Sequence, residues 1–260
     1  MTETMTDAPA AYGAAPMEWA SAIASALTPR LLPCVCDPGA APARGSKIDA
    51  AKAAKVPSVM RGKRTFSGLV GWTRRPAATS GDIAKWSARP EHGILCRTGA
   101  LTDAAEDVIY ALDADIDDAD EARLVFRCLC QTLGRQAAPV RCRGGSARWA
   151  CLIREPGGVA AGKRIIEMRS GCVEILGSGG QLALAGTHPS GTRYAWQVRS
   201  IETAQDTASD GPAVIDAPAG SVDRIVEALS VISSGRTTTA ADRAARQIGE
   251  TYEAADSLAD

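Results

Sequence analysis

A run of apolar residues that ends in alternating carboxylates constrains this chain more than any other feature. The run is Val108–Ile116, and it continues into Asp117 and Asp118. If it forms a β-strand, alternate side chains share a face, so Asp113 and Asp115 point the same way. Neighbouring carboxylates repel each other unless a cation lies between them, and oxygen ligands of this kind suit Mg²⁺ or Mn²⁺. The stretch predicts a divalent-metal site for phosphoryl chemistry, with a strand that runs into a solvated acidic turn as the alternative.

The charges are segregated along the chain, although the net charge is only −1. Between positions 41 and 90 there are eleven Lys or Arg and two acids, and between 103 and 121 there are nine acids and no base. Between 135 and 170 there are again eight bases and two acids. Acids flanked by basic segments suit a protein that handles phosphates with metal help, whereas solvated charged faces would explain the pattern without a function.

Length and composition place the chain among globular proteins. Its 260 residues can hold one substantial domain or two small ones. No apolar stretch approaches the roughly 18 residues needed to cross a bilayer, and the N-terminus lacks the basic and apolar regions of a secretory signal. We therefore expect a cytoplasmic protein that has no membrane partner.

The eight cysteines lack the spacing of a zinc site. None forms a Cys-x-x-Cys pair, and neither His92 nor His188 lies near one in sequence. We expect reduced thiols that pack as small apolar side chains, with a zinc site assembled in three dimensions as the less favoured alternative.

The pattern of apolar residues divides the chain into three parts. Residues 1–16 are expected to be disordered, 17–233 to form one domain, and 234–260 to form a polar tail of helical character. Helices are expected at 17–27, 81–86 with Asp82 as N-cap, 119–133 ended by Gly134, and 222–232. Strands are expected at 31–35, 93–96, 108–116, 140–143, 147–153, 164–168, 172–176, 181–185 and 194–198. A Gly144–Gly145 turn would join the fourth and fifth strands, and 37–80 would be largely a basic loop.

Two further segments carry residues suited to phosphate chemistry. Glu174 is a charged residue inside the apolar strand 172–176, and burying it costs free energy unless it faces water or is neutralised by a metal. The hairpin 141–149 offers arginines and turn amides that suit a triphosphate.

These motifs, in this order, resemble the archaeo-eukaryotic primase superfamily, and most closely its Prim-Pol domains from phages, prophages and plasmids. Such domains carry an apolar strand that ends in Asp-x-Asp or Asp-x-Glu, then Ser-x-His, then an apolar residue followed by an acid. Asp113 and Asp115 match the first motif, and Glu174 after Val173 matches the third. The second motif reads Ser-Ala-Arg at 146–148, with Arg where the family usually has His. The resemblance covers about residues 17–200.

The resemblance implies an RRM-like primase-polymerase catalytic core of the α+β class, with a mostly antiparallel sheet flanked by helices. It implies template-directed nucleotidyl transfer that extends or synthesises primers on single-stranded DNA in phage or plasmid replication. Mg²⁺ or Mn²⁺ bridged by Asp113, Asp115 and Glu174 would activate the primer 3′-hydroxyl, and a second ion would hold the nucleoside triphosphate. Any replicative helicase would be a separately encoded protein.

The same resemblance suggests two further groups of residues. Nucleotide binding is expected from Arg143, Ser146, Arg148, Gln181 and His188. DNA binding by charge and base stacking is expected from Arg61, Lys63, Arg64, Trp72, Arg74 and Arg75, with a solvated loop as the alternative. Arg148 would bind phosphate as a permanent cation, but it could not titrate near neutral pH as a His would.

Three other interpretations fit parts of the sequence. Phosphatases of the haloacid dehalogenase type also place Asp-x-Asp at a strand end, but their motif has Thr or Val at the position where this chain has Asp117. Residues 157–163 have the glycine and lysine spacing of a P-loop, but Arg164 replaces the Ser or Thr that binds Mg²⁺. A catalytically weakened primase-like module that binds DNA in replication initiation is favoured by Arg148. The retention of all three acids argues against it, because a pure binder gains nothing from carboxylates that face a phosphate backbone.

Overall fold

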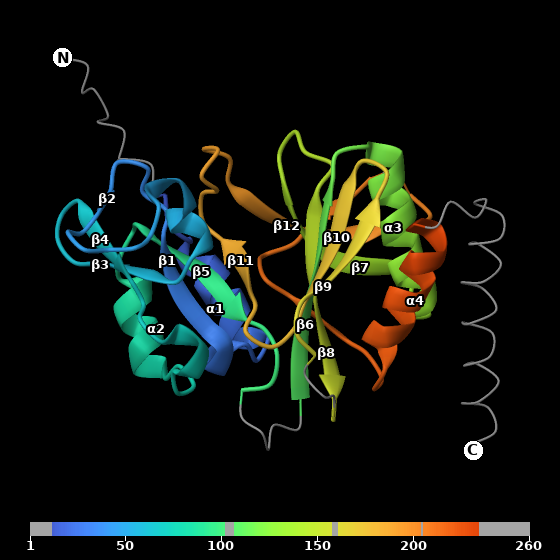
Figure 1. Ribbon diagram of the computed structural model, residues 1–260, viewed down its shortest axis with the longest axis horizontal. Coiled ribbons are helices and arrows are strands. Elements are labelled where there is room, and N and C mark those ends of the chain that lie inside the picture. Colours follow the sequence, from blue (N-terminus) through green and yellow to red (C-terminus); the bar gives the residue numbers. More distant parts are fainter. Residues whose placement is uncertain (1–11, 102–106, 158–160, 204, 234–260) are drawn as a thin grey trace, which may run out of the picture.

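The fold is of the α+β class with mostly antiparallel sheets, as the family resemblance implies (Figure 1). The computed structural model describes residues 12–101, 107–157, 161–203 and 205–233. Residues 1–11 of the expected disordered N-terminus and the expected tail at 234–260 lie outside this part. None of the described helices is long and apolar enough to cross a membrane.

The largest sheet has eight strands and carries the predicted acidic strand near its centre. Its order is β13-β12-β7-β8-β6-β10-β9, and β14 pairs in parallel with β8. Its strands are β6 (Asp107–Ile116), β7 (Ala137–Arg143), β8 (Trp149–Pro156), β9 (Arg164–Met168), β10 (Gly171–Leu176), β12 (Tyr194–Ser200), β13 (Thr207–Ala208) and β14 (Val214–Asp216). The predicted hairpin joins β7 to β8, and Gly145 in its turn adopts a φ of +73°. The sequence did not predict β13 and β14.

Strand β6 is buried on both faces, which explains its long apolar run. Val108 and Leu112 belong to the core between the sheet and the two helices at 119–132 and 221–233. Ile109 and Ala111 belong to a second core, shared with the N-terminal half, by which we mean the elements before β6 together with the strand at 181–185. Because side chains alternate along a strand, the odd-numbered positions continue this second face beyond Ala111. The acidic end of β6 therefore lies where the large sheet meets the N-terminal half.

Helices α3 (Ala119–Thr132) and α4 (Ser221–Ser233) pack together on one face of the large sheet (Figure 1). The N-cap of α3 is Asp118, whose carboxylate accepts a hydrogen bond from Glu121 N at 2.8 Å. Just beyond the helix, Gly134 adopts a φ of +60°, as predicted for a C-terminal glycine. The helices thus leave the opposite face of the sheet to the N-terminal half.

The N-terminal half is built on a three-stranded antiparallel sheet of order β1-β5-β11. Its strands are β1 (Leu31–Val35), β5 (His92–Arg97) and β11 (Gln181–Ala185). Trp19 of α1 (Pro16–Ala24) and Trp86 of α2 (Ser80–Ser87) pack into the core that this sheet shares with β6. Because β11 comes from late in the chain, it ties the two halves together (Figure 1).

A second small sheet occupies the region that we expected to be a basic loop, so this expectation is wrong. Its order is β2 (Ala41–Pro42), β4 (Thr65–Gly68) and β3 (Ser58–Met60). The 3₁₀ helices are η1 (Thr28–Arg30), η2 (Ala50–Lys55) and η3 (Trp72–Arg74). Phe66 is fully buried in the small core beside this sheet. Strands of two to four residues are too short to show an alternating pattern in the sequence.

Two details at the helix ends differ from expectation. Thr79, not Asp82, is the N-cap of α2: Thr79 Oγ1 accepts from Asp82 N at 3.1 Å, and the Asp82 carboxylate accepts from Thr79 N at 3.0 Å. Helix α1, the first helix of the chain, ends at Ala24 rather than at residue 27. Residues 13 and 14, expected within the disordered N-terminus, hydrogen-bond to the backbone of residues 90 and 92.

All eight cysteines are free thiols, and six of them are buried. Burial raises the pKa of Cys96 to about 12, so this thiol stays protonated. Such cysteines act as small apolar side chains in the core.

Candidate active site

The three predicted acids occupy neighbouring positions on one face of the large sheet. Asp113 and Asp115 are two residues apart on β6, and Glu174 on β10 is the cross-strand partner of Asp113. Side chains paired in this way have Cβ atoms about 5 Å apart. The close approach of the two strands requires a glycine at position 171, where an added Cβ would lie 2.0 Å from the Asp115 carbonyl oxygen. The local strand pairing therefore places the three acids at neighbouring positions of one sheet face.

The acids line a pocket of about 260 Å³ between the large sheet and the N-terminal half. Among the described lining residues, four are basic: Lys55, Arg141, Arg143 and Arg148. The remaining lining residues are Cys142, Leu176, Gln181, Leu182, Ala183, His188 and Tyr194. A group of acids with a surplus of bases has the chemistry needed to bind a metal together with a polyphosphate.

Asp113 is held by a buried arginine. Arg141 Nη2 donates to Asp113 Oδ1 at 3.3 Å, and Arg141 Nη1 donates to the Ala183 carbonyl at 2.5 Å. The guanidinium also lies over the Tyr194 ring, 4.5 Å from its centroid. Burial raises the pKa of Asp113, and the charge of Arg141 lowers it in part. The ionised form of Asp113 therefore depends on a cation close by.

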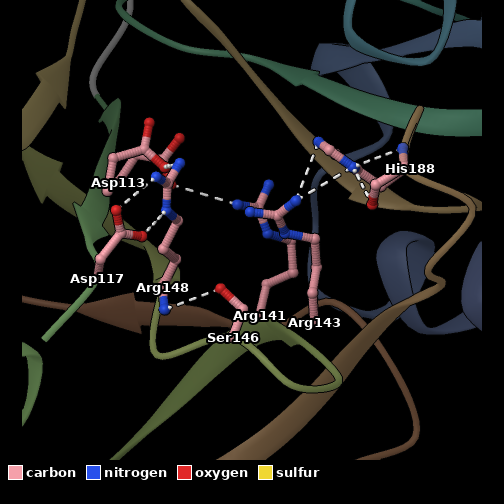
Figure 2. A network of polar contacts seen from close by, with 9 residues as sticks. Asp113, Asp117, Arg141, Arg143, Ser146, Arg148 and His188 are labelled. Carbon is pink, nitrogen blue, oxygen red and sulfur yellow. Dashed lines mark hydrogen bonds and ion pairs between the residues drawn. The ribbon is translucent and has the colours of Figure 1, made fainter. Parts of the chain in front are cut away.

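Asp115 is held by Arg148, the residue at the position where the family usually has His. Arg148 Nη1 donates to Asp115 Oδ1 at 3.3 Å. Its Nε and Nη2 donate to the two carboxylate oxygens of Asp117 at 2.8 and 3.2 Å (Figure 2). The side-chain hydrogen bonding between Arg148 and Asp117 raises the pKa of Arg148 and lowers the pKa of Asp117. Arg148 thus contacts two acids at once.

Glu174 is paired with Lys163, whose Nζ donates to Glu174 Oε1 at 2.6 Å. Lys163 is the lysine of the stretch that has P-loop spacing, of which residues 158–160 lie outside the described part. The Ala161 carbonyl of this stretch accepts from Ser178 N at 2.8 Å, which ties the loop to the turn after β10. In this structure the lysine therefore binds a carboxylate.

The three acids fit a divalent cation by their chemistry but are not a preformed cluster. Among the described residues, no group of three His, Cys, Asp or Glu side chains is gathered so that it could hold a metal ion. Each of the three acids is instead paired with a base. Neighbouring carboxylates on one sheet face offer the oxygen donors that Mg²⁺ and Mn²⁺ prefer, so an ion would bind as these pairs open.

His188 lies in a tight turn beside Arg143. Its Nδ1 accepts from Ser190 N at 3.0 Å, and its carbonyl accepts from Gly191 N at 2.8 Å. Arg143 Nη1 lies 3.1 Å from His188 Nδ1 and 3.2 Å from Nε2 (Figure 2). Desolvation, reinforced by the charge of Arg143, lowers the pKa of His188 to about 4. The ring is therefore neutral near pH 7, so it can donate or accept a hydrogen bond without adding a positive charge to the pocket.

The other expected nucleotide-binding residues, Gln181 and Ser146, differ in their surroundings. Gln181 lines the pocket, and its Nε2 donates to the Lys55 carbonyl at 2.7 Å. Its Oε1 is buried without a hydrogen-bond partner among the described residues, which leaves an acceptor for a ligand. Ser146 does not line the described pocket; its Oγ accepts from Arg148 N at 3.2 Å and thereby shapes the β7–β8 turn.

The residues expected to bind DNA lie around the small β2-β4-β3 sheet and outside the pocket. Five of the six are exposed: Arg61, Lys63, Arg64, Arg74 and Arg75. Trp72 is half-buried and packs against an apolar core, so only part of its ring is open for stacking. Arg97 Nη1 donates to the carbonyls of Trp72 and Arg75 at 3.2 and 2.8 Å, which anchors this basic segment to β5.

Sequence reasoning did not place Lys55 or Tyr194 at the pocket and did not foresee that Arg141 pairs with Asp113. It considered Lys163 only as the lysine of the rejected P-loop and not as the partner of Glu174. Arg141 could have been found, because it lies two residues before Arg143 on the same strand and shares its face. Lys55 ends a short 3₁₀ helix and Lys163 lies in a loop, so no α-helical or strand periodicity in the sequence indicates which way either side chain points.

One of the comparisons with known proteins identifies a family for this chain. No curated protein and no solved structure matches the chain. The family model described as bifunctional DNA primase/polymerase, N-terminal, matches residues 20–218. This match covers most of the chain and includes every lining residue of the pocket. The chain therefore belongs to the Prim-Pol family, whose description supports a nucleotidyltransferase of the DNA primase/polymerase type.

Proposed function

We propose that the chain is a template-directed DNA primase or polymerase that extends or synthesises primers on single-stranded DNA in phage or plasmid replication. Its family supports nucleotidyl transfer in general. The observation that carries the specific proposal is a single pocket in which Asp113, Asp115 and Glu174 face four bases. Acids alone would suit a metal, and bases alone would suit a phosphate, whereas the two together suit a metal-bound triphosphate.

Asp113, Asp115 and Glu174 would hold Mg²⁺ or Mn²⁺ through their carboxylate oxygens. Bound divalent ions supply Lewis acidity, which lowers the pKa of a primer 3′-hydroxyl, and charge, which neutralises a leaving pyrophosphate. Asp113 and Glu174 come from adjacent strands of a packed sheet, so their backbone positions are fixed before any ligand arrives. Asp113 is also partly desolvated, which strengthens its interaction with any cation near it.

The bases of the pocket would bind the triphosphate. Arg143 and Arg148 offer planar guanidinium groups that can bind phosphate oxygens bidentately, and Lys55 offers a point charge. Neutral His188 would orient the nucleotide by hydrogen bonds, as would Gln181, whose Oε1 has no hydrogen-bond partner in the described part of the chain. The exposed bases around Trp72 would hold the template strand by charge, with limited stacking on that ring. A replicative helicase, if the system uses one, would be a separately encoded partner.

The test is a polymerisation assay on single-stranded DNA with labelled nucleotides and Mg²⁺ or Mn²⁺, with and without a primer. The Asp113→Asn/Asp115→Asn double variant should lose at least 10³-fold in rate, because the substitution removes two anionic metal ligands while keeping their size. Asp216→Asn is the matched control, since Asp216 is an exposed acid that pairs with Arg154 away from the pocket. Products in the unprimed reaction would identify a primase.

DNA binding without any product, under conditions where a known polymerase works, would overturn the proposed reaction. It would leave a primase-like DNA-binding module as the better description. Product that persists in the double variant would overturn the assignment of the acids rather than the reaction.

A further inference from the structure

The guanidinium of Arg148 is bound by two acids of unequal surroundings. Nε and Nη2 contact Asp117, and Nη1 contacts Asp115, so all three nitrogens are engaged (Figure 2). Asp115 lines the pocket, whereas Asp117 is not among its described lining residues and lies just before the N-cap of α3. The nitrogens that Arg148 would use to bind a phosphate are therefore taken by acids of the same chain.

The backbone next to both Asp117 and Arg148 is fixed by hydrogen bonds or by packing. Asp117 N donates to the Ser170 carbonyl at 3.1 Å, and the next residue donates its N–H to Ser170 Oγ at 3.1 Å. On the other side, Trp149 follows Arg148 and is fully buried, and its Nε1 donates to the Ala122 carbonyl at 3.1 Å. The main chain at both ends is fixed, so exchange of partners needs only side-chain rotation.

The contact is also exposed enough to be replaced by a ligand. The side chains of Arg148, Asp115 and Asp117 are 36%, 43% and 71% exposed, whereas Arg141 and Asp113 are only 9% and 20% exposed. Exposed ion pairs contribute little to stability, because water solvates the separated charges well. A triphosphate carries more charge than a carboxylate, so it can compete for the guanidinium once Asp115 is neutralised.

We propose that Arg148 exchanges between the Asp115–Asp117 pair and the triphosphate of the incoming nucleotide, and that Asp117 is the residue that holds Arg148 away from phosphate until a divalent ion neutralises Asp115. This inference rests on the proposed function, because it requires that the pocket binds a nucleoside triphosphate. It adds a positioning role for Asp117. Metal and nucleotide then bind cooperatively, and each increases the affinity of the protein for the other by the same factor.

The test measures binding of labelled dATP without divalent metal, in the presence of EDTA. Asp117→Asn should bind dATP about tenfold more tightly than the wild type, because Arg148 loses its bidentate partner. Arg148→Ala should bind more weakly than the wild type, and the Asp117→Asn/Arg148→Ala double variant should match Arg148→Ala. Asp117→Glu keeps the charge and should keep the weak metal-free binding of the wild type.

Glu167→Gln is the control for loss of a negative charge, since Glu167 is an exposed acid on β9 outside the pocket. It should not change metal-free binding of dATP. If Glu167→Gln gained as much metal-free affinity for dATP as Asp117→Asn, the gain would be a nonspecific charge effect and the exchange would be overturned. The same would follow if the gain in Asp117→Asn persisted after removal of Arg148. No gain in Asp117→Asn would overturn it directly.

A second measurement does not depend on Asp117→Asn being folded. Mn²⁺ titration followed by electron paramagnetic resonance should give about threefold tighter Mn²⁺ binding to Arg148→Ala than to the wild type, because Asp115 has lost its competing cation. Unchanged or weaker Mn²⁺ binding would contradict the exchange. If the wild type binds no dATP even with Mn²⁺, the proposed function itself fails. If it binds dATP with Mn²⁺ but Asp117→Asn shows no metal-free gain, only the exchange fails.

Discussion

Arg141 and Asp113 form an ion pair at the inner wall of the pocket, with Nη2 and Oδ1 3.3 Å apart. It is the most buried of the three pairs that hold the acids of the site. Breaking a buried pair by removing one partner leaves a charge without compensation, which costs about 3–5 kcal/mol. This pair therefore stabilises the fold at the wall of the pocket.

Replacing Arg141 by Met should lower the free energy of unfolding at pH 7 by about 3 kcal/mol. The pKa of Asp113 is already raised by burial, and loss of Arg141 raises it further. The destabilisation should therefore shrink as the pH falls and Asp113 becomes protonated. Urea unfolding at pH 7 and pH 5 measures both effects.

Arg169→Met is the control for this change, because Arg169 is 79% exposed and lies 3.7 Å from Asp118. It should change stability by less than about 0.5 kcal/mol. If the loss in Arg141→Met were the same at both pH values, it would come from packing and not from charge.

Substituting Gly171 by Ala should destabilise the protein by about 3 kcal/mol and reduce polymerisation more than tenfold. The new Cβ would lie 2.0 Å from the Asp115 carbonyl, and the φ of +153° at this position disfavours any other residue. Strands β6 and β10 would have to separate next to the acids. Gly162→Ala, where an added Cβ meets nothing within 4 Å, should behave like the wild type in thermal unfolding and in the assay. Equal behaviour of the two variants would contradict the close approach.

His188 should make stability depend on pH in a defined window. Its pKa is lowered to about 4 in the folded protein, whereas an unfolded His titrates near 6.5. Between these values the unfolded chain binds more protons, so the free energy of unfolding falls as the pH falls from 6.5 towards 4. In His188→Gln this part of the pH dependence should vanish. The free energy of unfolding of the variant, relative to that of the wild type, should therefore be higher at pH 5 than at pH 7.5. A difference between the two proteins that does not change with pH would show that His188 titrates normally.

The exposed bases of the β3–β4 turn should contribute to DNA affinity through charge alone. Replacing Arg61, Lys63 and Arg64 by Ala should weaken binding of single-stranded DNA and reduce the slope of log K against log salt by about 2, since each phosphate contact contributes about 0.7. Fluorescence anisotropy over a salt series measures this slope. Arg123, Arg127 and Arg169, which line a surface near α3, form a matched triple. An equal loss in both triples would contradict a specific template path over the small sheet.

The acids of the site could be predicted because they lie on regular strands. Alternation along β6 placed Asp113 and Asp115 on one face, and the apolar surroundings of Glu174 marked it as exceptional, before their register was known. What alternation did not reveal was that each acid has its own base. The partners Lys163 and Arg148 come from a loop and a turn, where orientation depends on contacts distant in sequence.

The region between residues 37 and 80 was the least predictable from sequence. Its basic residues and glycines suggested a loop, yet Phe66 and Met60 form a small core against β1. Strands this short are stabilised by tertiary contacts and not by their own propensity, which is why sequence patterns do not reveal them.

Because β6 is packed between two cores, its amide protons should be among the slowest in the molecule to exchange with solvent. Arg148, by contrast, follows an exposed turn, and Lys163 follows a loop. The three acids and Arg141 therefore lie on packed strands, whereas Arg148 and Lys163, which pair with Asp115 and Glu174, lie outside regular strands. If the pocket binds a metal-bound triphosphate as proposed, rearrangement on binding would be confined to Arg148 and Lys163, and the three carboxylates would keep their register in the sheet.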